Sequence, residues 1–162
     1  MRALAIAAAF GSLVVASPAL ADTNDNFTGL RVGVTAGIDD VVNSPDTTDV
    51  VYGVDAGVDF GVGDRVTMGV EAFSTNMFES ERTIGAAARL GYAVNEDLLV
   101  FTRAGYANYE NVFNQNLDGL TVGGGLEYSI SDMTYAKVEY RYSDFENNVG
   151  NHGALVGIGL RF

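Results

Sequence analysis

GALVGIGLRF, residues 153–162, alternates between two kinds of side chain along its whole length. The even positions are apolar and end on Phe162, whereas the odd positions are mainly glycine and end on Arg161. Successive side chains of a β-strand point to opposite faces of the sheet. This stretch therefore predicts a strand with one bulky apolar face and one face that is small or charged.

The same alternation recurs in eight runs, and no convincing helical periodicity interrupts them. Each run is about as long as a tilted strand needs to cross a bilayer, roughly 9–11 residues. The runs cover residues 27–38, 50–60, 65–75, 83–94, 98–109, 119–130, 133–143 and 153–162. Tight turns at 61–64, 95–97 and 131–132 alternate with longer connections at 39–49, 76–82, 110–118 and 144–152, as is typical of outer-membrane barrels.

The two faces of these runs indicate which side is inside. In a soluble antiparallel sheet the bulky face would cover a core. Here the opposite face is mostly glycine and charge, and aligned charges do not face lipid. The consistent arrangement has the bulky face outward in lipid and the small, charged face inward. We therefore predict an all-β fold, an eight-stranded antiparallel up-and-down transmembrane β-barrel.

The charged residues of the runs test this orientation. The basic residues on the inward face are Arg31, Arg65, Arg89, Arg103, Lys137, Arg141 and Arg161. No charge falls on the outward face of a run, where at the bilayer midplane it would cost roughly 2–4 kcal/mol. We expect a lumen charge network formed by Arg31, Asp55, Asp59, Glu71, Arg89, Arg103, Glu127, Lys137, Glu139 and Arg141.

The lumen admits two interpretations. Eight strands leave an interior just wide enough for side chains to fill, and buried charges must pair. We therefore expect a side-chain-filled lumen that does not conduct. The inward glycines favour the alternative, a narrow porin-like diffusion channel, because they leave gaps that water could occupy.

Residues 1–21 have the pattern of a cleaved signal peptide: Met1-Arg2, an apolar run from Ala3 to Val15, and Ala19-Leu20-Ala21 before the cleavage site. We expect residues 22–162 to form one exported barrel domain. The chain has no cysteine, so disulfides do not hold it. Its net charge of −12 argues against nucleic-acid binding, and its hydrophobic content of 48% argues against disorder.

Two segments resemble a known family. KVEYRYSDF, residues 137–145, resembles the penultimate strand of the small opacity-type, OmpA-like outer-membrane barrels that are often called the porin family. GIGLRF, residues 157–162, is similar to the closing strand of that family. The resemblance implies a place in the bacterial outer membrane and implies that the β-barrel assembly machinery reads Phe162 as an assembly signal. It does not extend to the peptidoglycan-binding domain of full-length OmpA proteins, so cell-wall anchoring is not implied.

No catalytic, metal-binding or cofactor-binding residue is predicted. His152 is the only histidine and is expected in a glycine-rich loop, without an adjacent serine or orienting acid. Ser129, Ser131 and Ser143 are the hydroxyls that it could recruit. Residues 123–125 are three glycines, but they lack the lysine and hydroxyl residue of a phosphate-binding loop.

The long connections are acidic. Divalent cations that bridge to surface glycolipid are one interpretation, and a solvated, repulsive rim is the preferred one, since no spacing matches a calcium loop. The acids are Asp39, Asp40, Asp46, Asp49, Glu79, Glu81, Glu110, Asp118, Asp144 and Glu146, against Arg82 alone. Outward aromatic residues are expected to form two girdles, with Tyr52, Tyr106 and Tyr142 near the long loops and Phe60, Tyr92, Tyr128 and Phe162 near the short turns.

These observations favour a structural, surface-exposed outer-membrane protein that is not an enzyme. Its expected partners are outer-membrane lipid and the assembly machinery, with no nucleic acid and no cofactor, and the barrel is expected to be a monomer. The alternatives are the diffusion channel, a lipid-modifying barrel enzyme and a soluble lipocalin-type barrel. The lipocalin type needs an apolar interior and a polar exterior, the reverse of this pattern.

Overall fold

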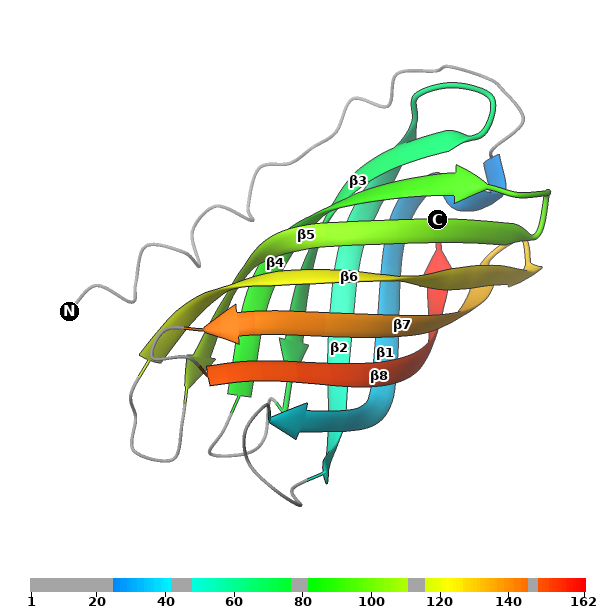
Figure 1. The fold of residues 1–162 in the computed structure, drawn as a ribbon. Coiled ribbons are helices and arrows are strands. Elements are labelled where there is room, and N and C mark those ends of the chain that lie inside the picture. Colours follow the sequence, from blue (N-terminus) through cyan, green and yellow to red (C-terminus); the bar gives the residue numbers. More distant parts are fainter. Residues whose placement is uncertain (1–24, 42–47, 77–81, 111–115, 146–148) are drawn as a thin grey trace.

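The computed structural model describes residues 25–41, 48–76, 82–110, 116–145 and 149–162 (Figure 1). The expected signal peptide, residues 1–21, lies outside these ranges. The elements are η1 (Asp25–Phe27), β1 (Gly29–Val41), β2 (Thr48–Gly61), β3 (Val66–Thr75), β4 (Arg82–Ala93), β5 (Leu98–Glu110), β6 (Asn116–Ser131), β7 (Thr134–Phe145) and β8 (Val149–Arg161).

Each strand pairs antiparallel with the next one, and β8 pairs with β1, so the sheet closes into a barrel. The predicted fold class is confirmed. We call the end with the β2–β3, β4–β5 and β6–β7 connections the turn end, and the opposite end the loop end. The C-terminus and η1 both lie at the turn end (Figure 1). No helix within the described ranges is long and apolar enough to span a membrane.

The strands run further toward the loop end than predicted. β8 begins at Val149 instead of residue 153, and β1 continues to Val41 instead of residue 38. The predicted boundaries followed the loss of apolar residues. Backbone pairing does not require apolar side chains where a strand leaves the lipid, so the ladder continues into the polar segments.

This extension corrects the expectation that no strand charge has outward parity. Five charged residues share the parity of the outward apolar residues at the loop end: Asp40, Arg82, Glu110, Asp118 and Asp144. The expectation that Arg65 lies on the inward face of a strand is also wrong. β3 begins one residue later, and exposed Arg65 lies in the β2–β3 turn, where its Nη1 is 3.4 Å from the Val94 carbonyl oxygen.

The wall has the two faces that the alternation predicts. Along the middle of β8, Val156 is 59% exposed and Ile158 52% exposed, whereas Leu155 is buried. Long apolar side chains on the outside are exposed throughout the described strands, from Leu30 in β1 to Leu160 in β8. The barrel is therefore apolar on the outside, while most of its strand charges are buried inside it.

The interior has three layers along the barrel axis. Charged side chains lie in the middle, and an apolar cluster lies toward each end. The turn-end cluster consists of Phe27, Ala93, Leu99 and Phe101. The loop-end cluster consists of Phe73, Ala107 and Phe145, with Tyr109 and Leu117 packed against it.

Candidate functional site

The charged middle layer begins, on its turn-end side, with two carboxylates that share three arginines. Asp59 Oδ2 accepts from Arg31 Nε at 2.8 Å, Arg89 Nη1 at 2.9 Å and Arg161 Nη1 at 3.1 Å. Glu127 accepts from Arg89 Nη2 at 2.7 Å and from Arg161 Nη2 at 2.5 Å. All five side chains are buried. Each guanidinium thus binds more than one carboxylate, which offsets part of the cost of removing it from water.

A second group lies toward the loop end. Glu71 contacts Arg31 Nη2 at 2.5 Å and Arg103 Nη1 at 2.6 Å. Glu139 Oε1 pairs with Arg103 Nη1 at 3.1 Å and accepts from Arg141 Nε at 2.9 Å. Arg31 contacts Asp59 in the first group and Glu71 in the second, so it joins the two groups. Its side chain is buried, with 1% of its surface exposed.

Lys137 and Asp55 complete the set. Lys137 Nζ is 2.7 Å from Asp55 Oδ1, although the two residues are 82 positions apart in the sequence. Asp55 also lies 3.3 Å from Arg31 Nη1, and Lys137 lies 3.9 Å from Glu139. The structure thus brings all ten residues of the expected charge network into one connected set of ion pairs, and it adds Arg161.

Like charges lie side by side in the wall, so the ion pairs reach across the interior. Arg89 on β4 is directly opposite Arg103 on β5, and Arg31 on β1 is directly opposite Arg161 on β8. The carboxylates that neutralise them come from β2, β3, β6 and β7. Pairing in the network therefore depends on the closed ring of strands and not on neighbouring strands alone.

Two interior aromatic rings, whose role the alternation pattern does not predict, contact three of the arginines. The guanidinium of Arg89 lies 4.1 Å from the ring centroid of Phe101. Arg103 and Arg141 lie 4.2 Å and 4.6 Å from the ring centroid of Phe73. Cation–π contacts of this kind are stabilising, most of all where water is excluded. The sequence could have indicated these two rings, because each has the same inward parity as the charged residues of its own strand.

The inward glycines make room for side chains that cross them. The ring of Tyr135 lies over Gly159 and Gly33, which are successive partners in the sheet. A Cβ atom at Gly33 would be 2.8 Å from Tyr135 Oη, and one at Gly57 would be 3.1 Å from Arg31 Nη2. At these positions side-chain atoms occupy the space that the channel interpretation assigns to water.

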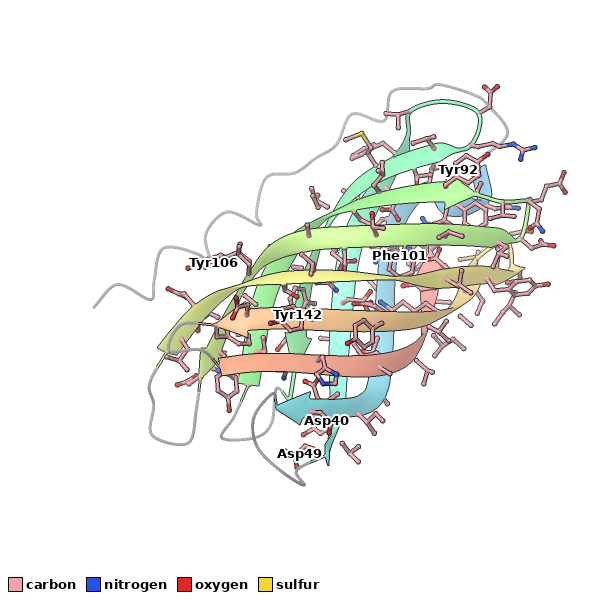
Figure 2. All side chains as sticks on the ribbon, viewed as in Figure 1. Asp40, Asp49, Tyr92, Phe101, Tyr106 and Tyr142 are labelled. Atoms are coloured by element: carbon pink, nitrogen blue, oxygen red, sulfur yellow. The ribbon has the colours of Figure 1, made fainter. Side chains whose placement is uncertain are left out.

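The outer wall carries the aromatic residues expected in girdles. Figure 2 shows Tyr92 near one end of the barrel and Tyr106 near the other. Both are about half exposed, and Phe162 at the turn end is 61% exposed. Tyrosine is favoured where one end of a side chain meets lipid and the other meets water. An apolar wall between two aromatic bands is the pattern of a membrane-spanning barrel.

The loop end carries acidic residues, with Asp40 and Asp49 at the ends of β1 and β2 (Figure 2). Arg82 Nε pairs with Glu110 at 2.7 Å, and Asp118 accepts from Asn108 Nδ2 at 2.8 Å. In the described parts of the chain, no three acidic, histidine or cysteine side chains gather as a metal site would require. The acids at positions 46, 79, 81 and 146 lie outside the described residues.

His152 is not in a loop. It lies in β8, opposite Asp40 and Tyr142, because this strand begins at Val149. Its ring is half-buried, with its centroid 6.1 Å from that of Tyr140. Ser143 has the opposite parity and donates inward to Thr121 Oγ1 at 3.1 Å. The structure therefore places His152 and Ser143 on opposite sides of the wall.

The closed barrel, its apolar exterior and its buried ionic interior define the class: a transmembrane β-barrel protein of the bacterial outer membrane. The chain belongs to the outer membrane protein beta-barrel domain family, whose model matches residues 5–162. The resemblance stated from residues 137–145 and 157–162 is thereby confirmed.

Curated relatives are outer-membrane proteins by name. The chain is similar to the 25 kDa outer-membrane immunogenic protein of Brucella ovis, with 31% identity over 120 residues that cover 70% of this chain and 56% of that protein. It is 30% identical to the Brucella canis protein of the same name over 132 residues, covering 70% of this chain and 59% of the relative. The chain thus spans less than two thirds of the length of these relatives.

Solved structures share the fold at low sequence identity. Ail, the attachment invasion locus protein of Yersinia pestis, matches with a TM-score of 0.62 and 15% identity, covering 83% of this chain and 97% of Ail. The N-terminal β-barrel domain of Pseudomonas aeruginosa OprF matches at 0.59 and 17%, covering 83% and 99%. The outer membrane enzyme PagL matches at 0.55 and 14%, covering 80% and 99%.

Proposed function

We propose that the chain is a structural, surface-exposed outer-membrane barrel whose interior neither conducts ions nor catalyses a reaction. The observation that carries this proposal is the connected network of buried ion pairs in the interior. The ion pairs occupy the middle of the interior, and an apolar cluster lies toward each end. A buried charge that loses its partner is strongly destabilising, so the network opposes the rearrangement that a conducting path would need.

Conductance of purified protein in planar bilayers tests this proposal. We expect no steady single-channel openings from the native chain. A variant that opens the middle layer, such as Arg103→Ala, is expected to conduct if it still inserts as a barrel. Steady openings of the native protein that persist after removal of contaminating porins would support the narrow channel instead.

Catalysis is the weaker alternative, and the likeness to PagL at 14% identity supports only a shared fold. His152 has an aromatic neighbour, and Ser143 faces the other side of the wall. We expect the purified barrel to leave lipopolysaccharide and phospholipid unmodified, as mass spectrometry of incubated lipid would show. Loss of acyl chains that disappears in a His152→Ala variant would contradict the proposal.

Export, assembly and partners are part of the same proposal. Cleavage after Ala21 would start the mature chain at Asp22, which intact-mass measurement of membrane-extracted protein tests. A mature protein that retains Met1 would argue against export by this route. The partners would be lipid on the outer wall and the assembly machinery at Phe162, and the barrel would be monomeric without binding nucleic acid. Protease cleavage at residues 42–47 on intact cells would locate the loop end at the cell surface.

A further inference from the structure

The turn-end cluster differs in origin from the rest of the barrel interior. Ala93, Leu99 and Phe101 belong to strands β4 and β5, but Phe27 belongs to η1, which precedes the first strand. Phe27 is nevertheless 1% exposed. A short segment that precedes the strands thus contributes a buried aromatic side chain to the turn-end opening of the barrel, which we call the turn-end mouth.

Two side-chain hydrogen bonds hold the segment in place. Arg161 Nη1 donates to the carbonyl oxygen of Phe27 at 2.7 Å, and the same nitrogen contacts Asp59. Asn26 Nδ2 donates to the carbonyl oxygen of Glu96 in the β4–β5 turn at 3.0 Å. The segment is therefore tied both to the charge network and to the opposite rim of the mouth.

Gly29 sets the direction in which the segment leaves β1. Its φ of +105° is a conformation that side-chain-bearing residues rarely adopt. A Cβ atom there would also clash with the carbonyl oxygen of Phe162. Regular pairing of β1 with the C-terminus begins immediately afterwards, where Leu30 N donates to that oxygen at 3.0 Å. Glycine at this position lets the chain turn from the wall into the mouth.

We propose that residues Asp25–Phe27 are a plug, a separable closure of the turn-end mouth that can leave and return while all eight strands stay paired. Among the residues that the structure describes, the loop-end cluster includes no segment of this kind, since Phe73, Ala107 and Phe145 are strand residues. The plug specifies how one end of the interior is closed, so it rests on the proposed sealed barrel. Because Arg161 belongs to β8, the plug acquires its anchor only when the closing strand is in position.

The test uses cysteine accessibility, since the chain has no cysteine of its own. Ala93→Cys places a thiol in the turn-end cluster, and Ala107→Cys places one in the loop-end cluster. The two alanines are 4% and 1% exposed, so they form a matched pair. The full mature chain in lipid vesicles is treated with a small cationic methanethiosulfonate, and the rate of modification is measured by mass spectrometry.

With Phe27 present, Ala93→Cys is expected to react slowly, but measurably faster than Ala107→Cys, because withdrawing the plug breaks no strand pair. Adding Phe27→Ala is expected to raise the Ala93→Cys rate at least about tenfold, which is the change for about 1.4 kcal/mol of lost plug binding. Phe27→Leu should restore most of the protection. The Ala107→Cys rate should stay the same in all three backgrounds.

Equal Ala93→Cys rates with Phe27 and with alanine there would overturn the plug. If Phe27→Ala prevents folding, the comparison of the two cysteines in the native background still decides, and equal rates would overturn it. The sealed barrel fails separately, through steady conductance of the native protein in planar bilayers. If the native barrel does not conduct, and Ala93→Cys is modified at the same rate with phenylalanine or alanine at position 27, the plug is overturned and the sealed barrel is not.

Discussion

The outer and inner faces of the same strands obey different rules. On the outer face, Val156 and Ile158 meet lipid and need only be apolar. On the inner face, Asp59 has three specific arginine partners, and Tyr135 fits over two specific glycines. The outer face is thus specified by chemical class and depth, whereas the inner face is specified by the identity of each residue and of its partners.

The largest difference in stability is expected between a variant that breaks an inner ion pair and one that breaks an outer ion pair. Glu71→Gln removes the charge shared by Arg31 and Arg103, whereas Glu110→Gln removes that of an exposed pair with Arg82. Breaking a buried pair costs about 3–5 kcal/mol, and a surface pair contributes about 1 kcal/mol or less. Urea unfolding in lipid vesicles, followed by heat-modifiable migration on gels, measures both. Equal losses would show that the inner charges are as well hydrated as the rim.

The next largest difference in stability is expected between outer-face positions at different depths in the membrane. Val156 lies in the middle of β8, and Val50, which is 74% exposed, lies near the loop end of β2. Val156→Arg is expected to cost about 2–4 kcal/mol, and Val50→Arg at most about 1 kcal/mol, because only the first charge enters the hydrocarbon. The same unfolding measurement applies. A similar tolerance of both arginines would mean that the middle of β8 does not face lipid.

A third comparison uses glycines on the two faces. Gly159→Ala would push its Cβ into the ring of Tyr135. Gly124 has outward parity, and a Cβ there would lie 3.1 Å from the Phe101 carbonyl oxygen and 3.8 Å from Thr102 Cγ2. Overpacking costs typically about 1–3 kcal/mol, so Gly159→Ala is expected to destabilise within that range. Gly124→Ala should change stability by less than about 0.5 kcal/mol. The double variant Gly159→Ala with Tyr135→Leu should recover part of the loss.

The smallest effect on stability is expected at the C-terminus. Phe162→Ala keeps the backbone bonds to Leu30 and removes only an exposed ring. We expect a lower yield of assembled barrel, unchanged export to the periplasm and nearly native unfolding in urea. Phe60→Ala, another outward aromatic at the turn end, is the control and should assemble normally. Equal yields from both variants would limit Phe162 to an ordinary lipid-facing residue.

Sequence alone predicted the strands and their faces because alternation is a local property. Ten inward charges could be named in this way, from Arg31 to Arg141. Their partners could not, because Lys137 meets Asp55 only through the register of the closed barrel. The crossing of Tyr135 over glycine was missed for the same reason, and Phe27 was missed because it was assigned to a strand.

The facing arginines at the β1–β8 seam bear on how the barrel is completed. Arg31 and Arg161 become direct neighbours only when the first and last strands meet. Their mutual repulsion is balanced by Asp59 from β2 and Glu127 from β6. If the intervening strands do not hold those carboxylates in position, closure leaves two facing guanidiniums without their counter-charges. The seam makes completion of the barrel a cooperative event, in which a chain with one misaligned strand meets an electrostatic barrier at its final step.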